Sequence, residues 1–182
     1  MKKATVFVAG SWGTALASVL ADNGLDVLMW TRGAEQAAEI NERRSNAKYV
    51  PGARLSERIR ATTDLGRAAD FGDVLLFAAP SSAMRAVARE ASSRIRPEQL
   101  VIHATKGFEA DTLMRMSSVL EEELGREAGS VVVLSGPSHA EEVMAKQPTT
   151  VVVASQRAEL AAAAQDLLIN SVFRVYTNSD VA

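Results

Sequence analysis

The stretch VAGSWGTALA, residues 8–17, decides the fold expected of this chain. It lies between a short apolar run, residues 5–8, and an alanine-rich segment whose apolar residues recur with helical spacing through residue 22. A glycine-rich turn between a strand and a helix presents free backbone N–H groups and the positive end of the helix dipole. At the first strand of a parallel sheet, such a turn binds the pyrophosphate of a dinucleotide. The stretch therefore predicts a dinucleotide site.

One position departs from the G-x-G-x-x-G pattern of such turns. Gly10 would let the backbone approach a phosphate, and Gly13 would let the helix lie close to the strand. Val8 stands where the pattern has its first glycine, and a β-branched residue is strongly disfavoured at positive φ. If Val8 keeps extended angles, the turn must begin one residue later, which weakens cofactor binding without removing the site. The alternative is that both glycines only allow a helix to pack on a strand.

Short apolar runs alternate with helical segments along the chain. Strands are expected over residues 5–8, 26–30, 58–62, 73–79, 100–104, 130–134, 149–154 and 173–176. Helices are expected over residues 14–22, 34–44, 64–69, 82–94, 111–124 and 157–169. This alternation implies parallel strands joined by right-handed crossovers. We predict one α/β domain over residues 1–182, a doubly wound, Rossmann-type, mostly parallel sheet with helices on both faces and room for antiparallel strands near the C-terminal end.

Composition narrows the classes of function. The chain has 182 residues, 47% of them apolar, and a formal net charge of -2, which favours a soluble globular protein without the basic face that nucleic acid requires. Because the chain has no cysteine and only two histidines, we expect no metal site. The absence of cysteine also favours a cytoplasmic location. No apolar run is long enough to span a membrane. The basic start and apolar residues 4–9 resemble a secretory signal, but the break at residues 10–11 and the following strand pattern favour a folded domain.

The end of the second predicted strand bears on the choice of cofactor. NAD-type sites usually carry Asp or Glu about 20 residues beyond the glycines, where the carboxylate binds the ribose hydroxyls. Residues 31–33 are TRG, so a guanidinium is present there and a carboxylate is not. Arg32 could pair with a 2′-phosphate or stack on adenine, so both NADP and NAD stay open as cofactors. An ordinary surface arginine is the alternative.

Several strings of the sequence together resemble bacterial NAD(P)-dependent glycerol-3-phosphate dehydrogenases. They follow the family's order over essentially the whole chain: GSWGTALA (10–17), NAKYVP (46–51), TTD (62–64), APS (79–81), TKG (105–107), VVVLSGPSHAEEV (131–143) and FRVYTNSDV (173–181). Family members have glycine where this chain has Val8. They also continue into a helical domain that carries the catalytic lysine, so the resemblance is to the amino-terminal, dinucleotide-binding domain alone. It implies interconversion of dihydroxyacetone phosphate and sn-glycerol 3-phosphate by hydride transfer with NAD(P)(H), feeding phospholipid synthesis.

The resemblance also implies roles for individual residues. Cofactor contacts are implied for Gly10, Ser11, Trp12, Gly13, Arg32, Tyr49, Pro80, Ser81, Lys106 and Ala140. Substrate contacts are implied for Lys106, Gly136 and Ser138, and no metal is implied. Lys106 follows a predicted strand at its carboxyl end, where its charge can meet a phosphate or a carbonyl oxygen. Ser138 also begins the S-x-x-E pattern of a capping box, so a helix is expected to start there, and His139 is given no catalytic role.

No catalytic residue is expected within this chain. The chain alone should therefore bind NADPH or NADH weakly and turn over little. Two other functions stay open: a non-catalytic dinucleotide-binding regulatory module, and a domain of another 3-hydroxyacid or ketopantoate-type dehydrogenase. The expected partner is a small-molecule phosphate substrate, and a homodimer of the full-length enzyme is compatible with the resemblance.

Overall fold

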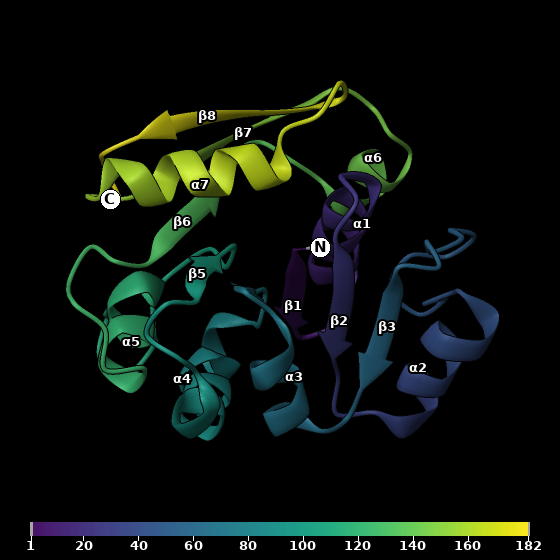
Figure 1. Cartoon of the computed structure of the whole chain (residues 1–182), viewed down its shortest axis with the longest axis horizontal. Coiled ribbons are helices and arrows are strands. Elements are labelled where there is room, and N and C mark those ends of the chain that lie inside the picture. Colours follow the sequence, from purple (N-terminus) through teal and green to yellow (C-terminus); the bar gives the residue numbers. More distant parts are fainter. Residues whose placement is uncertain (1, 182) are drawn as a thin grey trace.

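The computed structural model describes residues 2–181, which are built around one sheet (Figure 1). Eight strands of this described part pair in the order β3-β2-β1-β4-β5-β6-β7-β8. The strands are β1 (Lys3–Phe7), β2 (Asp26–Trp30), β3 (Ile59–Thr62), β4 (Val74–Phe77), β5 (Leu100–His103), β6 (Val132–Ser135), β7 (Thr149–Ala154) and β8 (Phe173–Asn178). The strands from β1 to β6 run parallel, β7 is antiparallel to β6, and β8 is parallel to β7. The mostly parallel, Rossmann-type sheet predicted from the sequence is confirmed.

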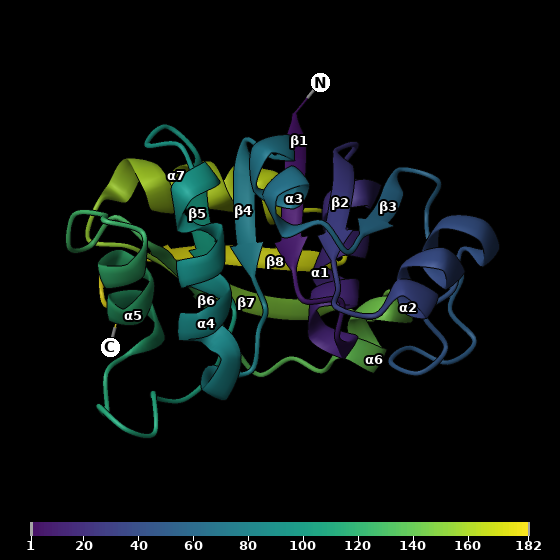
Figure 2. The same cartoon turned by 90° about the horizontal axis from the view of Figure 1, so that it is seen from below.

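Helices cover both faces of the sheet, as predicted. They are α1 (Ser11–Asp22), α2 (Ala34–Ala38), α3 (Leu65–Phe71), α4 (Ser81–Ala91), α5 (Met116–Glu123), α6 (Ala140–Met144) and α7 (Ala158–Leu168). Figure 2 shows α3, α4 and α5 on one face, whereas α1, α6 and α7 pack against the other. Because side chains alternate along a strand, Val6 enters one apolar cluster and Phe7 the other, where Phe7 stacks on Phe77.

The strand order reverses beside β1. The chain adds β2 and β3 on one side of β1, and then crosses to place β4 on the other side. Phe7, at the carboxyl end of β1, is level with Trp30 of β2 and Phe77 of β4. Connections that leave adjacent parallel strands in opposite directions open a crevice between them, and this is where ligands bind in such sheets. The glycine-rich turn after β1 lies at this point.

The largest differences between predicted and observed helix bounds occur in two helices, and the other predicted bounds differ by up to three residues. The helix expected over residues 34–44 is α-helical only through Ala38, and a π-helical turn over Glu39–Arg43 completes it. The helix expected over residues 111–124 begins only at Met116. The preceding residues form a loop, in which the N–H of Glu109 donates to the carbonyl of Met114 and the N–H of Leu113 to that of Glu109. These bonds satisfy the backbone without a helix.

The predicted capping box is wrong. Helix α6 starts at Ala140 with His139 as its N-cap residue, and no side chain caps it. Because His139 keeps an extended conformation, with φ of -115° and ψ of 139°, the helix begins one residue later than the S-x-x-E spacing requires. Glu141 is consequently the second helical residue rather than the third, and the reciprocal pair of hydrogen bonds does not form.

Within residues 2–181, no helix is long and apolar enough to cross a bilayer. The same residues bring together no group of three or more His, Cys, Asp or Glu side chains that could hold a metal ion.

Candidate functional site

The turn after β1 keeps the geometry of a glycine turn although it begins with valine. Val8 has a φ of 77°, so the condition under which the turn would start one residue later is not met. The N–H groups of Val8 and Ala9 both donate to the carbonyl of Trp30, at 3.1 Å. These bonds tie the turn to the end of β2 and hold Val8 in a left-handed conformation that costs an L-residue about 1–2 kcal/mol.

The two glycine positions of the turn differ in the room that the structure leaves for a side chain. A Cβ on Gly13 would lie 2.3 Å from the carbonyl oxygen of Val8, so only glycine lets α1 approach the strand this closely. A Cβ on Gly10 would meet nothing within 4 Å. Gly10 is the N-cap residue of α1, no side chain caps this helix, and its first turn holds no acidic residue. The first turn of α1 therefore carries N–H groups suited to an anion.

We expect Val8→Gly to raise the free energy of unfolding by about 1 kcal/mol, because glycine adopts this φ without strain and loses part of the gain to chain entropy. The substitution should also tighten dinucleotide binding. Urea denaturation and calorimetry measure the two effects. Val8→Ala is the matched control, since it removes the γ-methyl groups and keeps the Cβ strain. An equal gain in Val8→Ala would show that side-chain crowding, not backbone strain, is responsible.

Two amide side chains that the sequence analysis missed anchor the turn. The Nδ2 of the fully buried Asn46 donates to the carbonyl of Ala9 (3.0 Å) and to Oγ1 of Thr14 (2.8 Å). Gln36 donates through Nε2 to the same carbonyl, at 2.6 Å, and to Oδ1 of Asn46. Asn46 lies in one of the family strings, but a sequence pattern does not indicate that its partner is a carbonyl 37 residues away. The network holds the Ala9 carbonyl inside the protein.

A cavity of about 370 Å³ lies beside the turn. It brings together four of the predicted cofactor residues: Gly10, Arg32, Tyr49 and Pro80. The Arg32 guanidinium lies 5.8 Å from the centre of the Trp30 ring, and the Lys48 ammonium lies 5.3 Å from that of the Tyr49 ring. The cavity therefore combines aromatic surface with two cations, which suits a nucleoside with an attached phosphate.

The loop that carries Tyr49 is fixed by Glu39. Its Oε1 accepts hydrogen bonds from the N–H of Ala47 and the hydroxyl of Ser45, both at 2.7 Å. The backbone bond, followed by the serine bond, lowers the pKa of the Glu39 carboxyl. The charged carboxylate thus holds one wall of the cavity at neutral pH.

Two of the three predicted substrate residues border a second cavity. A cavity of about 470 Å³ at the carboxyl ends of β5 and β6 is lined by Lys106 and Gly136, and the Lys106 ammonium donates to the Gly136 carbonyl at 3.1 Å. Ser138 borders neither cavity. Ala140, the first residue of α6, does not either, and like Trp12 it packs against the apolar cluster between the sheet and helices α1, α6 and α7. Ser11 and Ser81 are the first residues of α1 and α4.

The second cavity also contains a side chain with no predicted role. His103 is 4% exposed, and neither of its ring nitrogens has a hydrogen-bond partner among the described residues. Burial lowers the pKa of His103 to about 4, and a weaker backbone interaction with Thr105 opposes this shift. The imidazole is therefore neutral at physiological pH.

Comparison with known families agrees with this geometry. The model of the family "NAD-dependent glycerol-3-phosphate dehydrogenase N-terminus" matches residues 3–161. The chain belongs to this family. The predicted resemblance to its amino-terminal domain is confirmed.

Individual members of the glycerol-3-phosphate dehydrogenase family match the whole chain. The glycerol-3-phosphate dehydrogenase [NAD(P)+] of Lysinibacillus sphaericus (strain C3-41) is 47% identical over 182 residues, which are 100% of this chain and 54% of that protein. The Bacillus subtilis (strain 168) protein of the same name is also 47% identical, and 53% of its length is covered. This chain thus spans about half the length of these curated relatives. A crystal structure of glycerol-3-phosphate dehydrogenase from Coxiella burnetii superposes with a TM-score of 0.91 at 32% identity, over 99% of this chain and 55% of that one.

Proposed function

We propose that this chain is the NAD(P)-binding part of an enzyme that interconverts dihydroxyacetone phosphate and sn-glycerol 3-phosphate, and that its product feeds phospholipid synthesis. One observation carries the proposal: Gly10, Arg32 and Tyr49 border a single cavity beside the point where the strand order reverses. The names of the relatives support the reaction, because the proteins of Lysinibacillus sphaericus and Bacillus subtilis are called glycerol-3-phosphate dehydrogenase [NAD(P)+].

The residues of the turn fit a dinucleotide. The space above Gly10 is open to at least 4 Å from an added Cβ, and α1 begins there without a side-chain cap. An anionic diphosphate can therefore approach the first turn of α1, where Ser11 and Trp12 stand beside Gly10 and Gly13. The cavity of about 370 Å³ lies at the lower end of the range for ligand pockets, which suits the adenosine half of the cofactor. The nicotinamide half would extend past Pro80 and Ser81 toward Lys106 and Ala140.

In this proposal the chain binds and orients the reactants. A bound nicotinamide ring supplies or accepts the hydride. The Lys106 ammonium keeps two donors beyond its bond to Gly136, and these can contact a phosphate or a substrate carbonyl oxygen. The backbone beyond Gly136, including Ser138, would form the other side of the substrate site. We assign no general base to this chain, so nucleotide binding without appreciable turnover is expected of it alone.

Arg32→Glu tests the orientation of the cofactor. If Arg32 binds the 2′-phosphate, the variant should lose NADPH affinity roughly 10- to 100-fold and keep NADH affinity within about threefold, because only NADPH carries that charge. Calorimetric titration with NADPH and with NADH measures the two changes in affinity. Arg174→Glu is the matched control: it makes the same change of charge at an exposed position of β8 that borders neither cavity. Equal losses for NADPH and NADH would remove Arg32 from the ribose-phosphate side, and a wild-type chain that binds neither nucleotide would refute the proposed function.

A further inference from the structure

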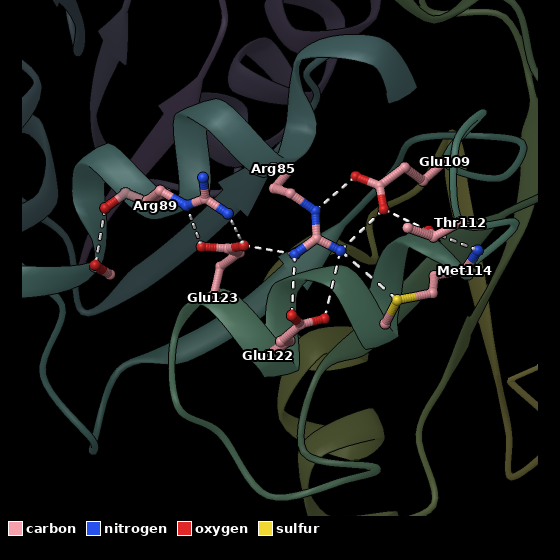
Figure 3. Close-up of polar contacts among 8 residues, drawn as sticks. Arg85, Arg89, Glu109, Thr112, Met114, Glu122 and Glu123 are labelled. Carbon is pink, nitrogen blue, oxygen red and sulfur yellow. Dashed lines mark hydrogen bonds and ion pairs between the residues drawn. The ribbon is translucent and has the colours of Figure 1, made fainter.

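An ion cluster outside the predicted site joins two helices to the loop that carries Lys106. Its centre is Arg85 of α4 (Figure 3). The guanidinium binds Glu109 of the loop through two nitrogens, with Nε–Oε1 at 2.7 Å and Nη2–Oε2 at 2.9 Å. It also contacts Glu123 and Glu122 of α5, at 2.5 Å and 3.3 Å. A bidentate arginine–carboxylate pair fixes both the distance and the direction between its partners.

The cluster is shielded from water more than most surface ion pairs. The side chains of Arg85, Glu109 and Glu123 are 21%, 13% and 9% exposed. Hydrogen bonds from Arg85 and then Thr112 lower the pKa of Glu109 to about 2. Arg89, followed by Arg85, lowers the pKa of Glu123 to about 2. The carboxylates that hold Arg85 therefore keep their charge throughout the neutral range.

The loop between β5 and α5 has a second anchor on the other side of Lys106. The hydroxyl of Thr105 donates to the carbonyl of Ala79 at 2.6 Å. Ala79 stands just before Pro80 and α4, so both anchors attach the loop to the same segment of the chain. Lys106 lies between them, one residue after Thr105 and three before Glu109. Its ammonium reaches the Gly136 carbonyl across the second cavity.

We propose that Arg85 is a positioning residue that sets the place of Lys106. It does not border either cavity, and it acts through Glu109. The cofactor cavity is bordered by three residues of the same segment, Pro80, Ala83 and Val87. The ion pair between Arg85 and Glu109 is therefore a clamp that also sets the distance between that cavity and Lys106. The effect of the Lys106 position on nucleotide binding rests on the proposed function. The restraint that Arg85 places on the loop does not.

The neighbouring Arg89 provides a matched control. It lies on α4 one turn after Arg85 and bonds Glu123 through Nε and Nη2, at 2.9 and 2.7 Å. Among residues 2–181, Arg89 thus joins α4 to α5 and makes no hydrogen bond or ion pair with the loop. A variant of Arg89 loses an ion pair of the same cluster and leaves the Glu109 contact in place.

Amide hydrogen exchange of wild type, Arg85→Met, Glu109→Gln, the double variant and Arg89→Met tests the restraint. Arg85→Met and Glu109→Gln should each speed exchange of the Glu109 and Leu113 amides by at least about tenfold, because each removes charge-assisted bonds to the loop. The double variant should exchange no faster than either single variant, since the two residues act as one pair. Arg89→Met should leave these amides as they are in wild type.

Nucleotide titration of the same variants tests the position of Lys106. Arg85→Met should weaken NADPH binding about tenfold and leave the binding of 2′,5′-ADP unchanged, because that probe fills only the adenosine side. Arg85→Lys should restore part of the affinity, since one ammonium replaces one of the guanidinium contacts. Equal exchange in Arg85→Met and Arg89→Met, or equal loss for both nucleotides, would overturn the proposal. If wild type binds no nucleotide, the proposed function fails, and the exchange data still decide whether Arg85 restrains the loop.

Discussion

Gly13→Ala is expected to lower the free energy of unfolding by about 3 kcal/mol and to abolish measurable NADPH binding. The added Cβ would stand 2.3 Å from the Val8 carbonyl oxygen, which belongs to the backbone of a turn already tied to Trp30 by two hydrogen bonds. Neither side can move without breaking those bonds or separating α1 from the sheet. Urea denaturation gives the stability, and calorimetry gives the affinity.

Gly10→Ala separates stability from binding. Its Cβ would meet no protein atom within 4 Å, and the φ of -78° suits any residue, so stability should change by less than about 0.5 kcal/mol. The methyl group would nevertheless occupy the space above the first turn of α1 and should weaken NADPH binding about tenfold or more. If Gly10→Ala binds NADPH as wild type does, the diphosphate does not lie over this turn.

The stability of the chain is expected to fall by about 2 kcal/mol between pH 7.5 and pH 5 because of His103. Burial lowers its pKa from 6.5 to about 4, so in this range the unfolded chain takes up a proton that the folded chain does not. The contribution of neutral His103 to stability is therefore fully present above the unfolded-state pKa of 6.5 and is lost as the pH falls toward 4. The pKa values of Glu109 and Glu123 are about 2, so these carboxyls change the stability mainly below pH 4.5. Between pH 7.5 and pH 5 the expected change therefore comes from His103.

Two variants assign the effect, since the chain has only two histidines. His103→Leu should remove the slope and raise stability at pH 7 by about 1 kcal/mol, because two buried nitrogens without partners are replaced by apolar surface. His139→Gln should keep the slope, because His139 is exposed. Urea denaturation at intervals of half a pH unit measures both. A slope that persists in His103→Leu would mean that another group titrates on folding.

Much of the fold could be predicted because local patterns carry it. The apolar run over residues 26–30 indicates a strand that is buried on both faces, and it matches β2 to the residue. The β-branched run over residues 149–153 likewise indicates a strand, and the predicted range 149–154 matches β7. The family strings led to Gly10, Tyr49 and Pro80, and the end of the second predicted strand led to Arg32. The fold brings these four residues to one cavity. Prediction from the sequence failed where the backbone conformation is set by contacts with residues that are distant in the chain. The predicted capping box at Ser138 and the predicted start of a helix at residue 111 are of this kind, since their residue types suit a helix that begins later in the structure.

The sequence by itself determined the order of strands and helices along the chain, the location of the glycine-containing turn after β1 and the family. Each of these depends on the types and spacing of residues that are close in the chain. Only the tertiary structure decided the conformation of Val8, the anchoring of the Ala9 carbonyl by Gln36 and Asn46, and the clamp from Arg85 to Glu109. These features join residues 22 to 37 positions apart. Which donors meet which acceptors at such separations is set by the packing of helices on the sheet, which no local pattern records.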